Sequence, residues 1–196
     1  MTPKRLSIAV AAGVVLLLLV VGLVQLGTSS SSVAPSTLTP AQIRERLAGA
    51  PEPLAALHAQ ADQDLSGGLS ALRARLAVLR GTPVVINKWA SDCEPCRAEA
   101  PIFQRVSVSR GREVAFVGID SNENSRGEAL SFLRSFPVGY PSYYDHSGQA
   151  GLAITDSTFT PVTVFFNRSG GEFIHQGPYP SVAKLEAAIR RYALDA

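Results

Sequence analysis

Two cysteines, Cys93 and Cys96, have the spacing and the setting of a reactive thiol pair. They follow an apolar run that predicts a strand, and they open a stretch whose spacing predicts a helix. Cys-x-x-Cys at such a junction places the first sulfur at the helix N-terminus, where free N–H groups and the helix dipole stabilise a thiolate. The second sulfur lies one turn further, close enough to form a disulfide. Because the thiolate is the attacking species, the pattern predicts a disulfide-exchange centre.

The charged neighbours of the pair act in opposite directions. Glu94 lies between the cysteines, and its negative charge disfavours a thiolate. Arg97 follows the second cysteine, and its positive charge favours a thiolate. Their balance sets the reduction potential, so the sequence predicts exchange chemistry without predicting its direction.

Other uses of a Cys-x-x-Cys pair need residues that this chain lacks at the required places. Covalent haem attachment needs a histidine after the second cysteine, where the chain has Arg97. A zinc site needs two more ligands nearby, and the histidines His58, His146 and His175 are scattered. Two alternatives stay open beside redox exchange: a static structural disulfide, and a Cu(I) site formed by two soft thiolates. We expect no cofactor and no metal ion.

The segments around the pair alternate between strand and helix. Apolar or alternating runs predict strands, and stretches with helical spacing predict helices. In chain order these are strand 84–86, helix 94–108, strand 114–119, helix 126–136, strand 162–166, strand 172–176 and helix 181–194. Such alternation predicts a central sheet covered by helices, so we expect an α/β domain over 81–196.

The N-terminal part of the chain has the composition of a membrane anchor and a tether. Residues 6–26 carry no charge and are long enough for a helix that spans the roughly 30 Å hydrocarbon core. Lys4 and Arg5 precede this run, and 27–38 is small, polar and uncharged. We therefore expect a cytoplasmic tip and transmembrane helix within 1–26, a flexible tether over 27–38, and a domain outside the cytoplasmic membrane.

A helical lead-in is expected between the tether and the domain, over 39–80. Thr39, Pro40 and Gln42 form the pattern of a capping box with proline at the first helical position.

A cleaved secretory signal is the alternative interpretation of the apolar run 6–26, although the apolar core of such a signal is normally about 7–15 residues and this run is longer. Either interpretation exports the domain to a compartment where disulfides persist.

The net charge argues against one class of partner. The chain has 18 Lys and Arg against 16 Asp and Glu, a formal +2. Lys4 and Arg5 account for the excess, so the rest of the chain is neutral. A neutral domain lacks the basic surface that nucleic-acid binding requires, and we expect no nucleic-acid partner.

The stretch KWASDCEPCRAEAP resembles the active-site signature of thioredoxin-fold proteins of the TlpA/ResA type. Such proteins are tethered thiol–disulfide oxidoreductases on the outer face of bacterial membranes, with the usual signature N-F-W-A-x-W-C-x-P-C-x-x-E-x-P. The resemblance covers about 81–194 and implies a thioredoxin-like fold, with a central mixed sheet flanked by helices. The matching positions are Asn87, Trp89, Ala90, Cys93, Pro95, Cys96, Glu99 and Pro101.

The resemblance also implies catalytic roles. Cys93 is expected to attack the disulfide of a partner, and Cys96 to resolve the mixed disulfide. Pro161 is expected to be a cis-proline that faces the pair, with Thr160 before it, so that the backbone there pairs with a bound peptide. Glu123 aligns with an acidic residue that tunes protonation, and it is expected to accept or deliver the proton of the buried cysteine.

Docking residues follow from the same signature. Trp89 is expected to pack beside the cysteines and to shape the surface that a partner meets, together with Glu94 and Pro95. Two positions depart from the signature: Asp92 replaces an aromatic residue before the first cysteine, and Lys88 replaces phenylalanine. Glu99, although it matches, is expected to be a surface or hinge contact of the active-site helix.

The function implied by the resemblance is the reduction of protein disulfides, with apocytochrome c as one client and a membrane thiol-electron donor as a second partner. One alternative is an exported oxidase or isomerase that inserts disulfides by the same chemistry in the opposite direction. The other is a tethered Cu(I) chaperone. Copper-binding relatives of this fold typically space their cysteines by three residues and add a histidine, which this chain does not do.

Overall fold

The computed structural model describes residues 38–195 of the chain. The expected transmembrane helix lies outside these residues, as does the expected tether except for Leu38. Among the helices within 38–195, none has both the length and the apolar composition to cross a membrane.

A six-stranded mixed sheet forms the centre of the domain, with the strands in the order β1-β4-β3-β2-β5-β6. Neighbours from β1 to β2 run parallel, whereas β5 is antiparallel to both β2 and β6. The bounds are β1 Asp64–Leu65, β2 Val84–Trp89, β3 Ala115–Ser121, β4 Ser142–Asp145, β5 Val162–Phe166 and β6 Glu172–Gln176. The expected mixed sheet is therefore present.

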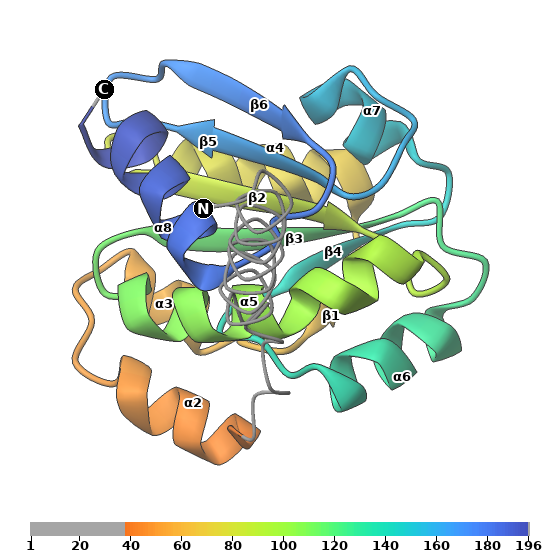
Figure 1. Cartoon of the computed structure of the whole chain (residues 1–196), viewed down its shortest axis with the longest axis horizontal. Helices are drawn as coiled ribbons and strands as arrows, with labels where there is room; N and C mark the ends of the chain where they lie inside the picture. The colour runs from red at the N-terminus through yellow and green to blue at the C-terminus, as the bar shows by residue number, and fades with distance from the viewer. Residues whose placement is uncertain (1–37, 196) are drawn as a thin grey trace, which may run out of the picture. The chain divides into compact units, whose positions relative to one another are not determined.

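Helices cover both faces of this sheet. Figure 1 shows α5 and α8 on one face and α4 and α7 on the other, and α5 with α8 and α4 with α7 are packed pairs. The helices are α2 Pro40–Leu47, α3 Leu54–His58, α4 Gly68–Val78, α5 Glu94–Arg110, α6 Arg126–Ser135, α7 Gln149–Thr155 and α8 Val182–Ile189, followed by a π-helical turn η1 Arg190–Leu194. The α/β architecture agrees with the sequence prediction.

Strand β2 is buried along its whole length because helices cover both faces. Successive side chains of a strand point to opposite faces, so Val85 joins the core under α5 and α8. Val84 and Ile86 join the second core, against α4. This alternation continues to the end of β2 and sends Lys88 and Trp89 in opposite directions.

Residues 39–80 pack against the rest of the domain, with α2 on α5 and the later part of the segment on the sheet. The capping box at Thr39 and Gln42 is formed and begins α2. Leu57, Leu72 and Leu79 from this segment are buried in the same core as the side chains of β2 and β3. The segment therefore contributes directly to the core of the domain.

The sequence missed two strands and one helix: β1, β4 and α7. Strand β1 has two residues, and β4 is the polar and aromatic run Ser142–Asp145. Neither has the apolar run or the alternation that identifies a strand in sequence. Strand β4 forms on the edge of β3, and β1 then pairs with β4, so both depend on tertiary contacts.

Candidate redox site at the Cys93–Cys96 pair

The two cysteines form a disulfide at the start of α5, with their Cα atoms 5.2 Å apart. Cys93 is the N-cap residue of α5, and its Sγ accepts a hydrogen bond of 3.2 Å from the backbone N–H of Cys96. Cys93 is 9% exposed and Cys96 only 1%. The helix N-terminus thus favours negative charge on the more accessible sulfur, as a nucleophile requires.

Trp89 packs behind the cysteines in the same core cluster. Its indole ring stacks on Phe132 of α6 with centroids 4.5 Å apart, and its Nε1 donates a hydrogen bond of 3.1 Å to Ser142 Oγ. Because the ring is buried, Trp89 supports the redox loop from behind and offers little area for direct contact with a partner.

The surface next to Cys93 is formed by exposed charged residues. Asp92, Glu94 and Pro95 are all exposed around the first cysteine. The Arg97 guanidinium lies over the Phe136 ring, 5.3 Å from its centroid, and also donates to the Ser91 carbonyl at 3.5 Å. The opposing charges predicted around the thiol are therefore both at the surface.

Pro161 lies beside the end of β2. The Thr160–Pro161 peptide bond is cis, as the resemblance implied. In the antiparallel register of β2 and β5, Lys88 is opposite Val162, so the next position places Pro161 alongside Trp89. The Pro161 carbonyl accepts a hydrogen bond of 3.0 Å from the Gly177 N–H.

Glu123 is buried and holds the loop in front of Cys93. Its carboxylate accepts hydrogen bonds from the Ser91 backbone N–H at 2.9 Å, from Ser91 Oγ at 2.9 Å and from the Asn124 N–H at 3.1 Å. These bonds connect Glu123 to the residue two positions before Cys93. The structure thus places Glu123 beneath the redox loop, as a group that positions it.

A second acid in this region, Asp120, was not predicted from the sequence. It is fully buried on β3, opposite Trp89 in the register, and neither carboxyl oxygen has a hydrogen-bond donor within the described part of the chain. Burial, and after it the carboxylates of Glu123, Asp64 and Asp145, together raise its pKa to about 9. Asp120 is therefore a neutral acid at pH 7, able to donate its proton toward Glu123.

Glu99 is not the surface contact that the sequence suggested. It is buried, and its Oε2 accepts a hydrogen bond of 3.0 Å from the Tyr179 N–H, while Oε1 has no partner among the described residues. Burial raises its pKa to about 8, against the lowering effect of that hydrogen bond. Glu99 follows Cys96 by three residues, so it shares the buried face of α5. That spacing was the signal in the sequence.

Lys88 is buried on the opposite face of β2 from Trp89. Its Nζ donates a hydrogen bond of 2.5 Å to the Ser157 carbonyl, in the loop that leads to Pro161. Burial lowers its pKa, and the negative charge of Asp145 acts in the opposite direction. The departure from the signature at this position therefore adds a connection between β2 and the 156–160 loop.

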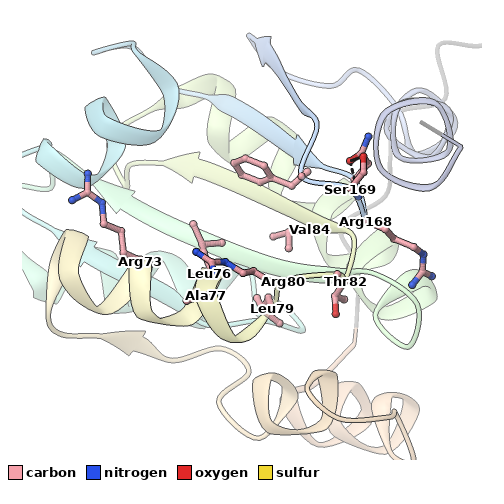
Figure 2. A pocket seen from close by; sticks show the side chains of 13 residues that line it. Arg73, Leu76, Ala77, Leu79, Arg80, Thr82, Val84, Arg168 and Ser169 are labelled. Carbon is pink, nitrogen blue, oxygen red and sulfur yellow. Dashed lines mark hydrogen bonds between the residues drawn. The ribbon is translucent and has the colours of Figure 1, made fainter.

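The cavity next to the disulfide is too small to hold a small-molecule ligand. The cavity that Cys96 lines together with Trp89 has a volume of about 10 Å³, whereas small-molecule sites are typically about 300–1,000 Å³. A larger groove of about 620 Å³ lies between α4 and the β5–β6 turn, at the other end of β2. Figure 2 shows Arg73 and Arg168 on opposite sides of this groove, directed apart. The guanidinium groups of Arg73 and Arg168 therefore do not converge on one ligand position.

Within 38–195, no group of three or more His, Cys, Asp or Glu side chains is placed to hold a metal ion. The site is a disulfide backed by buried carboxylic acids, an arrangement that supports thiol exchange.

Comparisons with known proteins agree with this chemistry. No family model matches the chain. ResA from Bacillus subtilis, named a thiol-disulfide oxidoreductase, is 29% identical over 99 residues, which are 50% of this chain and 54% of ResA. DsbE from Pseudomonas fluorescens biotype C, named a thiol:disulfide interchange protein, is 29% identical over 137 residues, 68% of either chain. The chain is related to thioredoxin-fold proteins of the ResA and DsbE type.

A solved structure supports the same relationship. A secreted disulfide oxidoreductase of Mycobacterium tuberculosis, homologous to Escherichia coli DsbE, has a TM-score of 0.51 and 26% sequence identity. The alignment covers 58% of this chain and 83% of that one. The fold is therefore thioredoxin-like. The chain spans 39–54% of the length of the first curated relatives that it matches.

Proposed function

We propose that the chain is a thiol–disulfide oxidoreductase that reduces disulfides of protein partners through Cys93 and Cys96. The observation that carries this proposal is the position of the Cys93 sulfur at the N-cap of α5, where it accepts the Cys96 N–H. A sulfur held there is stabilised as a thiolate. Cys96 is more deeply buried, which favours attack on the adjacent Cys93 over attack on a partner.

The reaction begins with the reduced pair. The Cys93 thiolate attacks one sulfur of the client disulfide, and the other client sulfur leaves and takes up a proton. Cys96 then loses its proton and attacks Cys93 Sγ in the mixed disulfide, which releases the second client thiol. Two electrons pass to the client, and Cys93 and Cys96 end as the disulfide seen in the structure.

The resolving step needs a group that takes the proton of Cys96. Glu99 is one helical turn away, and one of its carboxyl oxygens has no partner among residues 38–195. Its pKa of about 8 is near that of a thiol. Glu123 reaches the redox loop through Ser91. We assign the proton transfer to Glu99 and the positioning of the loop to Glu123. Glu99→Gln is then expected to slow resolution more than Glu123→Gln does.

The first experiment is the reduction potential of the Cys93–Cys96 pair in the full-length protein in detergent, equilibrated against glutathione or dithiothreitol. A value near or below the roughly −270 mV of thioredoxin supports a reductant that depends on an electron donor. A value toward the roughly −120 mV of strong oxidants contradicts the reducing direction and supports disulfide insertion. Failure of the pair to cycle indicates a structural disulfide and contradicts the enzyme proposal.

The proposal includes a place in the cell. The uncharged run at 6–26, preceded by Lys4 and Arg5, supports a single transmembrane helix with the catalytic domain outside the cytoplasm. A membrane thiol-electron donor is then needed to keep the pair reduced, because disulfides persist in the compartment outside the cytoplasm. Apocytochrome c is the client class that the TlpA/ResA resemblance favours, and it is part of the proposal.

A further inference from the structure

Phe159 has the most exposed of the large apolar side chains in the described part of the chain, at 75%. Single exposed apolar residues are common on protein surfaces, so exposure alone assigns no role. Its position is what distinguishes it. Phe159 comes two residues before Pro161, in the loop that joins α7 to β5.

The register of the sheet brings this loop to the redox end of β2. Strands β2 and β5 are antiparallel with Lys88 opposite Val162, so residues that precede β5 run alongside residues that follow β2. Pro161 is therefore level with Trp89. The residues before Pro161 and the loop from Trp89 to Cys93 both extend beyond this same end of the sheet. Phe159 thus belongs to the same end of the sheet as the disulfide.

Hydrogen bonds hold the loop that carries Phe159 in place. The Phe159 N–H donates to Ser157 Oγ at 3.2 Å, and the Ser157 carbonyl accepts hydrogen bonds from Lys88 Nζ at 2.5 Å and from Thr155 Oγ1 at 3.2 Å. Placing a lysine in a buried position is costly unless its ammonium group is hydrogen-bonded. Lys88 meets that condition by fixing the backbone two residues before the exposed phenylalanine.

A fixed backbone lowers the entropy lost when the exposed ring binds a partner. An aromatic ring on a held loop, at the same end of the sheet as a reactive disulfide, is therefore suited to bind an apolar side chain of the molecule whose disulfide is exchanged. The nearby carboxylates Asp92 and Glu94, both exposed, make the same surface unfavourable for acidic segments.

We propose that Phe159 is a docking contact for client proteins, and that it selects extended segments with a large apolar side chain a few residues from the client cysteine. The inference rests on the proposed oxidoreductase function and adds a substrate class to it. The partner is a polypeptide and not a small disulfide, because the contact needs a side chain other than the cysteines that are exchanged.

The test uses the full-length reduced protein in detergent and two peptide disulfides that differ at one position, leucine in one and serine in the other, three residues from the cysteine. The ratio of their second-order rate constants measures apolar selectivity. We expect a ratio of about ten for the natural chain and about one for Phe159→Ser. Phe159→Leu, which keeps an apolar side chain, is expected to restore most of the ratio.

Val78→Ser is the matched control, since Val78 is 64% exposed and lies at the end of α4, away from the redox end of β2. It is expected to keep both the ratio and the rate with glutathione disulfide. An unchanged ratio in Phe159→Ser overturns this inference and leaves the proposed function intact. Absence of exchange with any disulfide, glutathione included, overturns both.

Discussion

At the scale of single residues, the buried ionisable groups behind the disulfide are stabilised in different ways. Glu123 accepts three hydrogen bonds, and Lys88 donates one to a backbone carbonyl. Asp120 has no donor within the described residues and is surrounded by other carboxylates, so its neutral form is the stable one. The sheet therefore carries a buried carboxylic acid next to Trp89.

Replacement of Asp120 by asparagine tests that protonation state. The pKa of Asp120 is raised from about 3.9 in an unfolded chain to about 9 in the fold, so the native state holds a proton that the unfolded state releases. The free energy of unfolding should then fall as the pH rises from about 4 to about 9. The Asp120→Asn variant has no proton to release at this position. At pH 8 its free energy of unfolding is therefore expected to exceed that of the natural protein by on the order of 2 kcal/mol.

The measurement is urea unfolding of the full-length oxidised protein and of the variant between pH 5 and 9. The two curves are expected to diverge as the pH rises. Parallel pH profiles would show that Asp120 is not the buried acid that the contacts indicate.

The two cysteines are expected to differ in reactivity because they differ in exposure and in position on α5. Cys96→Ser should accumulate a mixed disulfide with a peptide client, since the resolving sulfur is absent. Cys93→Ser should form far less, because Cys96 is buried. Non-reducing electrophoresis with mass spectrometry measures both adducts, and equal trapping by the two variants would contradict the assigned order of attack.

At the scale of elements, the N-terminus of α5 and the loop before it act as one unit. The helix supplies the N–H groups that stabilise negative charge at Cys93, and the Ser91–Glu123 contacts fix the loop that delivers the cysteine to that position. Glu94 and Arg97 modify this field from the solvent side.

Charge substitutions in the first turn of α5 test the contribution of the helix. Glu94→Gln removes a negative charge next to the Cys93 sulfur and is expected to raise the rate of thiol alkylation at neutral pH, whereas Arg97→Gln should lower it. Both side chains are exposed, so changes of about two- to threefold are expected, and they should shrink in high salt. Alkylation kinetics of the reduced full-length protein measure both rates. Changes of the same sign in both variants would contradict a through-space charge effect.

At the scale of the whole molecule, the region before the signature-bearing domain is part of its core. Leu57, Leu72 and Leu79 pack with the residues of β2 and β3 on the α4 face of the sheet. Without them, α7 alone would cover that face of the two central strands, and much of its apolar surface would be exposed to water.

A chain shortened to 81–196 is therefore expected not to fold cooperatively, whereas a chain shortened to 38–196 should keep the cooperative transition. Each buried leucine contributes about 2–5 kcal/mol in such cores, and marginal stability does not survive the loss of several. Thermal unfolding followed by circular dichroism compares the two. A sharp transition in the 81–196 chain would show that the lead-in is dispensable.

The proposed transmembrane anchor is tested at the same scale. The full-length protein is expected to stay with membranes after alkaline carbonate extraction, and a chain lacking 1–26 is expected in the soluble fraction. Recovery of both chains in the soluble fraction would contradict the anchor and support cleavage or secretion.

Much of the domain was determined by sequence patterns that act locally. The apolar runs of β2, β3 and β5 and the helical spacing of α5, α6 and α8 could be identified because burial on one or two faces imposes a fixed period on a segment. The Cys-x-x-Cys pair was identifiable for a similar reason, since the chemistry of a helix N-terminus depends on adjacent residues. These features depend on spacing along the chain.

The tertiary structure alone decided which polar groups lie in the interior. Glu99 and Asp120 have the composition of surface residues, yet the packing of α5 on the sheet and the pairing of β3 with both β2 and β4 bury them and raise their pKa values. Likewise, Lys88 meets Ser157 across 69 positions of sequence. Desolvation and long-range hydrogen bonding depend on what the fold brings together. The spacing of Glu99 from Cys96 indicates only that the two share a face of α5, and the packing of that helix on the sheet decides that the face is buried.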